Sequence, residues 1–105
     1  MTTLRWLDFD YSEGTDDTGT FDALASVLKP QAAEVEAEIA QILAWADAAF
    51  PGQRGPTHEG GEWDADLQVG HEVAAGTARV VFALAISGSP AFCEAFRAHV
   101  GATDL

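Results

Sequence analysis

The stretch that decides the fold is "LDFDYSEGTDDTGTFDALASVL", Leu7 to Leu28. Apolar and polar residues alternate before its central polar segment and again after it. A period of two is typical of half-buried β-strands. The Gly-containing segment 12–19 between the two runs predicts the loop of a β-hairpin. We therefore expect two antiparallel strands, over 4–11 and 21–28.

The hairpin loop runs into "DDTGTF", Asp16 to Phe21, which two enzyme families contain in similar form. Asp-Lys-Thr-Gly-Thr-Leu is the phosphorylation loop of P-type ATPases, and Asp-Thr-Gly is the signature of aspartic proteases. Those motifs follow an apolar strand, whereas Asp16 follows the loop-forming residues 12–15. Since Asp, Thr and Gly also favour turns, we interpret the string as a turn and assign no catalytic residue.

A long amphipathic helix is predicted after the hairpin. Pro30 suits a first helical turn, and Val35, Ile39 and Ile42 share one face of the helix. Phe50-Pro51-Gly52 ends it. The segment that follows, "PGQRGPTHEGGE" over 51–62, holds four Gly and two Pro and predicts one irregular loop.

Two more strands and a second helix complete the chain. Residues 63–69 alternate, and a turn is expected near Gly76. The strand over 78–87 is apolar at nearly every position, which predicts a central strand covered on both faces. Ser89 is a predicted helix cap with Pro90 at the first position, and Gly101 is the predicted stop.

The predicted fold class is α+β in one domain, 1–105: a two-layer sandwich of a four-stranded, mainly antiparallel sheet with two helices on one face, in the order ββαββα. The residues expected on the core face are Leu7, Phe9, Tyr11, Phe21, Val27, Trp63, Leu67, Phe82, Leu84 and Ile86. The apolar residues expected on the open face are Trp6, Leu24, Leu28, Val81, Ala83 and Ala85. Aspartates share that open face: Asp8, Asp10, Asp22, Asp64 and Asp66.

Composition restricts the partners. Of 105 residues, 17 are Asp or Glu and five are Lys or Arg, so the formal net charge is -12. Such a surface repels phosphate backbones and anionic lipid, so we expect no nucleic-acid or membrane-surface partner, except through mimicry of a nucleic acid. With no apparent secretory signal and a lone Cys93, we expect a cytoplasmic protein.

The aspartates of the open face are a candidate metal site. If Tyr11 lies opposite Phe21, then Asp10 lies opposite Asp22, and like charges in that position destabilise a sheet. Arg5, Arg79, a divalent ion or a basic partner would offset the cost. Oxygen-rich sites suit Ca²⁺, Mg²⁺ or Mn²⁺, so a divalent cation is the one cofactor considered. The candidate ligands are Asp10, Asp22, Asp64 and Asp66, and the alternative is a solvated acidic surface.

The 51–62 loop is a second candidate site, made of Arg54, His58, Glu59 and Glu62. Its "HEGGE" is similar to the zinc-protease string His-Glu-x-x-His, but Glu62 replaces the second histidine and Gly60-Gly61 disfavours a helix. Arg54 would hold an anion or form a structural salt bridge.

Two residues near the carboxyl end carry reactive groups. Cys93 precedes Arg97 by one helical turn, which would favour a thiolate, but a buried Cys more often packs as a small apolar side chain. His99 shares a face with Phe92 and Phe96 and is interpreted as a packed or capping histidine.

The segments "LDFDYSEGTDDTGTFDALASV" and "FPGQRGPTHEGGEWDADLQ" together resemble the matching segments of a family of small bacterial proteins of unknown function. The resemblance implies no activity, substrate or catalytic residue.

The leading hypothesis is a non-enzymatic protein-interaction module that self-associates through the open face as an isologous dimer. The alternative is a divalent-metal-binding protein or small metal-assisted enzyme that uses the acidic face or the 51–62 loop.

Overall fold

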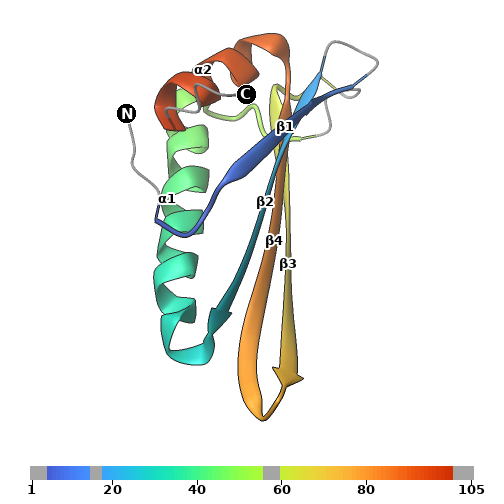
Figure 1. The fold of residues 1–105 in the computed structure, drawn as a ribbon. Coiled ribbons are helices and arrows are strands. Elements are labelled where there is room, and N and C mark those ends of the chain that lie inside the picture. Colours follow the sequence, from blue (N-terminus) through green and yellow to red (C-terminus); the bar gives the residue numbers. More distant parts are fainter. Residues whose placement is uncertain (1–4, 15–17, 56–59, 101–105) are drawn as a thin grey trace.

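The computed structural model describes residues 5–14, 18–55 and 60–100 and confirms the α+β class with the order ββαββα. Figure 1 shows the elements along the chain. Their bounds are β1 Phe9–Glu13, β2 Gly19–Leu28, a 3-10 turn η1 Lys29–Gln31, α1 Ala32–Ala49, β3 Trp63–Ala74, β4 Thr77–Gly88 and α2 Pro90–Val100.

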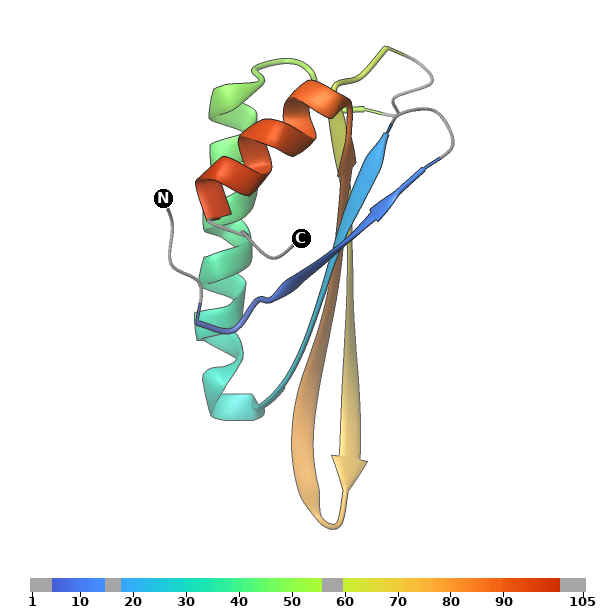
Figure 2. The same cartoon turned by 45° about the horizontal axis from the view of Figure 1, so that its top comes forward.

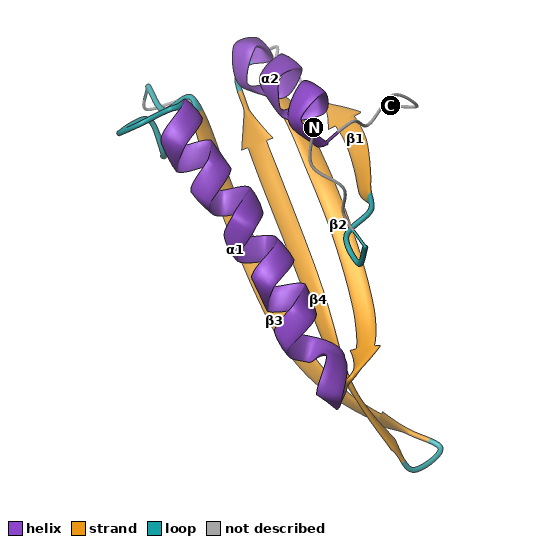
Figure 3. Cartoon of the chain, turned by 90° about the vertical axis from the view of Figure 1, so that its left-hand side faces the viewer, coloured by secondary structure: helices purple, strands orange, loops and turns teal. Residues whose placement is uncertain are grey.

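The four strands form one antiparallel sheet in the order β1-β2-β4-β3. Both helices lie on the same side of this sheet, as predicted (Figures 1 and 3). Strand β4 is central, but the expectation that it is covered on both faces is wrong. Its residues Val81, Ala83 and Ala85 are half-buried on the face that carries no helix, because both helices pack on the other face.

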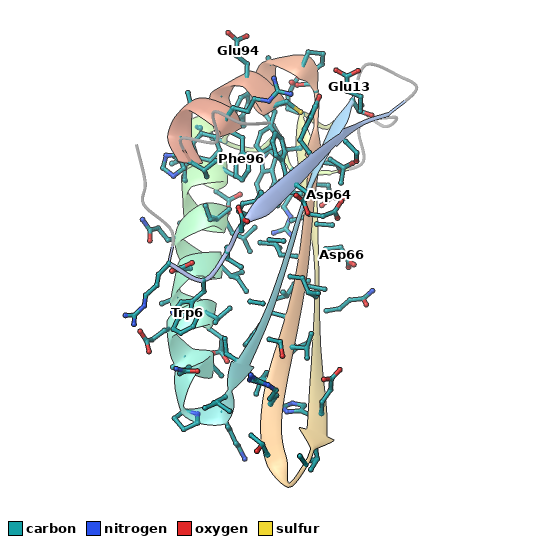
Figure 4. All side chains as sticks on the ribbon, in the orientation of Figure 1. Trp6, Glu13, Asp64, Asp66, Glu94 and Phe96 are labelled. Carbon is teal, nitrogen blue, oxygen red and sulfur yellow. The ribbon has the colours of Figure 1, made fainter. Side chains whose placement is uncertain are left out.

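The first strand begins later than predicted, at Phe9. Residues 5–7 leave the sheet because the Glu38 carboxylate of α1 accepts their backbone N–H groups. The N···O distances are 2.8 Å for Arg5, 3.0 Å for Trp6 and 3.1 Å for Leu7. Trp6 therefore packs against the core beside α1, and its predicted place on the open face is wrong (Figure 4).

Helix α1 has the predicted amphipathic face, with Val35, Ile39, Ile42 and Ala46 buried against the sheet. It begins after the 3-10 turn that contains Pro30, and the Phe50 N–H bonds to the Ala46 carbonyl at 2.9 Å where it ends. In the part of the chain that the structure describes, no helix is both long and apolar enough to cross a bilayer.

Helix α2 closes one end of the core with aromatic side chains. Phe96 lies 4.6 Å from Phe21 and 5.2 Å from Phe9, measured between ring centroids. The predicted cap is confirmed, since the Phe92 N–H donates to the Ser89 hydroxyl at 3.3 Å. The predicted stop at residue 101 lies outside the described residues.

The helix-facing side of β3 is less covered than predicted. Leu67 is 41% exposed, although its neighbour on β4, Leu84, is buried. Val69 is 48% exposed and Val73 is 77% exposed. Helix α1 packs against β2 and β4, and the turn end of the β3–β4 hairpin extends beyond it (Figures 1 and 2). The apolar pattern of β3 therefore continues past the helices.

Candidate functional site

A row of aspartates crosses the open face of the sheet. Tyr11 lies opposite Phe21, so the predicted pairing of Asp10 with Asp22 is confirmed. In the same row Asp22 lies opposite Ala85 of β4, and Ala85 lies opposite Asp66 of β3. Three carboxylates, from β1, β2 and β3, thus lie in one row across the sheet.

A shallow groove lies beside this row. Leu24, Ala83 and Gln68 form the next row, and Leu24 is 68% exposed. The groove has a volume of about 330 Å³ and an apolar floor under an acidic rim. Its lining residues are Asp10, Asp22, Ala23, Leu24, Asp66, Gln68, Ala83, Leu84 and Ala85.

The cations that could offset the acidic row lie elsewhere. Arg5 forms an exposed salt bridge with Glu34 at 3.6 Å, on the helix side of the molecule. Arg79 lies between Leu28 and Glu72 in the ladder, six residues along β4 from Ala85 and thus about 20 Å away. Asp66 accepts a hydrogen bond from the Gln68 amide at 3.5 Å, but the described residues form no ion pair with the row, so its charge is left for solvent or a partner.

Asp64 does not join the row. It lies opposite Ser87, in the row next to that of Asp66. The side chains of Asp64 and Asp66 both point away from the helices (Figure 4). Its Oδ1 lies 3.5 Å from Arg54 Nε and accepts the Ala65 N–H at 2.8 Å. Within residues 5–14, 18–55 and 60–100, no three His, Cys, Asp or Glu side chains are placed to hold a metal ion. The predicted metal ligands therefore do not form a cage in this structure.

The loop site is also divided. Arg54 lies over the Trp63 ring at 5.2 Å and donates to the Ala65 carbonyl at 3.4 Å, so it makes structural contacts. Glu62 accepts a hydrogen bond from the Ser89 hydroxyl. His58 and Glu59 lie outside the described residues. The described part of the loop thus makes structural contacts with β3 and with the residue that caps α2.

A larger hollow lies between the β1–β2 hairpin and α2, and the sequence did not indicate it. Its volume is about 540 Å³, and it is lined by Tyr11, Glu13, Gly14, Thr18, Pro90, Cys93, Glu94 and Arg97. The Arg97 guanidinium lies 4.1 Å from the centre of the Tyr11 ring. Contacts between a hairpin and a distant helix leave no periodic signal, which is why the sequence did not show the hollow.

Cys93 is not set up as a nucleophile. It is 4% exposed, and its thiol donates to the Gly88 carbonyl at 3.5 Å. Burial raises the pKa of the Cys93 thiol, against smaller opposite effects of Gly19 and Arg97. A Cβ at Gly19 would lie 2.8 Å from the sulfur and 2.4 Å from the Tyr11 ring, so the glycine permits this packing. The thiol is therefore protonated at neutral pH and unreactive.

His99 is a packed residue, as predicted. Its ring stacks on Trp45 at 4.4 Å with an interplanar angle of 10°. Burial lowers the pKa of the imidazole. A neutral stacked histidine contributes to the contact between α1 and α2.

The chain was compared with known proteins, and no family model, no curated protein and no solved structure matches it. The resemblance to small bacterial proteins therefore stays an expectation, and the function has to be argued from the surfaces themselves.

Proposed function

We propose that the protein is a non-enzymatic interaction module that binds a cationic, partly apolar segment of a partner protein on the open face of its sheet. One observation carries the proposal: an uncovered apolar floor lies directly beside a row of three carboxylates. The floor consists of Ala83 and Ala85, the exposed Leu24 lies beside it, and the row consists of Asp10, Asp22 and Asp66.

The chemistry of the groove selects this occupant. Leu24 is 68% exposed, and a partner that covers it removes apolar surface from water, which stabilises the complex. The carboxylates favour Lys or Arg beside it and disfavour anionic partners. A second copy docked on this face would bring two acidic rows together, so charge disfavours the isologous arrangement here.

The metal-binding alternative has less support. It rests on the pairing of Asp10 with Asp22, but Asp66 is separated from that pair by β4, and no three His, Cys, Asp or Glu side chains of the described residues come close enough together to hold an ion. Titration of Ca²⁺, Mg²⁺ and Mn²⁺ followed by the melting temperature tests it, because a bound ion raises the stability of the folded state.

The experiment that tests the interaction uses a nonapeptide of alternating Lys and Leu, with all-Lys and alternating Glu-Leu peptides for comparison. Backbone amide shifts are followed by NMR. We expect the Lys-Leu peptide to shift the amides of Leu24, Ala83 and Gln68, the all-Lys peptide to bind more weakly, and the Glu-Leu peptide not to bind.

Variants separate groove binding from general attraction to an acidic protein. Leu24→Ser should weaken binding of the Lys-Leu peptide. Val73→Ser removes an exposed apolar side chain from the other face and should leave the binding unchanged. Equal effects of the two variants, or shifts spread over the acidic residues of α1, would contradict the proposal.

A further inference from the structure

Strand β3 forms one edge of the sheet, and the backbone hydrogen bonds of Trp63 show which residues face outward from it. The Trp63 carbonyl accepts the Gly55 N–H at 2.8 Å, and the Trp63 N–H donates to the Gln53 carbonyl at 3.4 Å. The polar groups of Trp63 therefore point away from β4. Outward groups alternate along an antiparallel edge, and the β3–β4 register is continuous. The N–H and C=O groups of Leu67, Val69, His71 and Val73 thus point outward too.

At one end of this edge the outward backbone groups are hydrogen-bonded, and along the rest they are not. The Ala65 carbonyl accepts from Arg54 at 3.4 Å, and the Ala65 N–H donates to Asp64 at 2.8 Å. From residue 67 to residue 73, the described residues offer no partner to the outward groups. The side chains of the same outward residues lie on the helix-facing side, where Leu67, Val69 and Val73 are exposed. Residues 67–73 of β3 therefore combine unpaired backbone N–H and C=O groups with exposed apolar side chains.

Gly70 lies at the midpoint of this open stretch. A Cβ built on Gly70 would have no heavy atom within 4 Å, and Gly70 is not among the residues with positive φ. Its own subunit therefore does not require a glycine here, and the unbroken register shows no bulge. A glycine inside a regular strand weakens that strand and often marks a place where another backbone approaches closely.

We propose that a second copy of this chain pairs with β3, antiparallel, about a two-fold axis that passes through Gly70. In this register Leu67 lies opposite Val73 of the second copy, and Val69 lies opposite His71. Every outward group of the open stretch then meets an outward group of the other copy. Registers centred nearer Leu67 require the edge that Arg54 already occupies.

Charge supports the same register. Centring the pair on Val69 would place Asp66 opposite Glu72, and centring it on Gln68 would place Asp64 opposite Glu72. With the axis at Gly70, Glu72 lies opposite Gln68, and Asp66 lies opposite Ala74. No carboxylate then faces another, which matters in a chain with a formal net charge of -12.

The resulting dimer has one continuous sheet made from both copies. The helices of one copy lie on one side of its sheet (Figure 3). Because the axis is perpendicular to the sheet, the helices of both copies then lie on the same side of the dimer. Val73 of each projecting hairpin tip is covered beside Leu67 of the other copy. The open face with its groove stays free. The inference therefore goes beyond the proposed function and does not depend on it.

Disulfide trapping tests the proposal. Gly70 and its symmetry mate form a non-hydrogen-bonded pair with a Cα separation of about 4.5 Å, which permits a disulfide. Gly70→Cys should form a covalent dimer on mild oxidation. Ser26→Cys is the matched control, since Ser26 and Gly70 lie opposite Val81 in the same row. It should form no disulfide-linked dimer, and neither should the parent with its buried Cys93. A Gly70→Cys chain that is not cross-linked faster than Ser26→Cys would overturn the proposal.

Sedimentation equilibrium of the unmodified chain provides a second readout. We expect a reversible dimer that tightens with added NaCl, since salt screens the repulsion between two acidic copies. Val69→Pro removes an outward N–H that β4 does not use, so the folded monomer should survive while the dimer is lost. Val69→Ala keeps that N–H and should weaken the dimer less. A monomer at all salt concentrations, or a dimer that Val69→Pro leaves intact, would show that the edge serves something other than a second copy.

Discussion

Asp10 of β1 lies directly opposite Asp22 of β2, and both side chains are exposed on the open face of the sheet. Like charges in this position destabilise a strand pair by a few tenths to about 1 kcal/mol. Arg5 and Arg79 lie elsewhere and do not relieve the repulsion. The isolated protein therefore keeps an unfavourable pair at the site where we propose that a cationic segment binds.

Removal of one of these charges should stabilise the fold. We expect Asp22→Asn to raise the free energy of unfolding by a few tenths to about 1 kcal/mol in low salt, and by less in 0.5 M NaCl, because salt screens exposed charges. Urea denaturation at both salt concentrations measures the change. Glu36→Gln, on the exposed side of α1, is the charge-matched control and should change little. A gain that does not depend on salt would argue against repulsion between the two aspartates.

The Glu38 carboxylate should be a main attachment of the amino-terminal segment, because it accepts the N–H groups of Arg5, Trp6 and Leu7. Charged hydrogen bonds of this kind stabilise by about 1.5 to 3 kcal/mol, so we expect Glu38→Ala to cost that much. Faster amide exchange over residues 5–7 and red-shifted Trp6 emission should accompany the loss.

Glu34→Ala is the control for Glu38→Ala. It removes an exposed salt bridge to Arg5 and an exposed carboxylate in the first turn of α1, and it should cost less than about 1 kcal/mol. Similar costs for the two variants would show that the three backbone contacts contribute little.

The β3–β4 turn contains a residue that is poorly suited to its conformation. Ala75 has φ 52° and Gly76 has φ 79°, and two positive values are typical of a type I′ hairpin turn. Ala is strained in this region, while Asn tolerates it. We expect Ala75→Asn to stabilise the protein by about 0.5 to 1 kcal/mol, measured as an upward shift of the melting temperature. Ala75→Val should have the opposite effect, because a β-branched side chain fits this conformation worse.

The Cys93 thiol should make stability fall at alkaline pH. Burial raises its pKa in the folded state, so the folded protein keeps the thiol proton to a higher pH than the unfolded chain. Its contribution is complete below the unfolded pKa, about 8.5, and is lost as the pH rises through the folded value. The free energy of unfolding of Cys93→Ala should therefore decline less steeply above about pH 8.5 than that of the parent. Parallel profiles for the two proteins would contradict this.

The alternation of residues predicted the faces of the sheet well. Because the side-chain period of a strand is two, the pattern around 12–19 fixed both the hairpin and the pairing of Tyr11 with Phe21. The same reasoning failed at Trp6, where a tertiary contact decided the outcome. The Glu38 carboxylate draws residues 5–7 toward α1, and a partner 32 residues away from Trp6 has no signature in the local pattern.

Coverage of the sheet could not be predicted either. Leu67 lies on the helix-facing side, as expected, but alternation does not show how far the helices reach across four strands. The strand order that places β3 at the edge depends on packing of the whole chain. The open edge, the groove and the hollow beside Cys93 all arise from this packing, and so the candidate site was only partly visible in the sequence.

The hairpin of β3 and β4 continues past the helices, so its length can change without any change in the packed core. Its tip contributes no residue to the buried core. One residue added to each arm at the turn, or one removed, would leave every pairing between the insertion point and the core unchanged. Insertions and deletions that come in matched pairs can therefore accumulate at 73–78 without reaching the interior, and evolution can lengthen or shorten this part of the sheet while the rest of the domain keeps its shape.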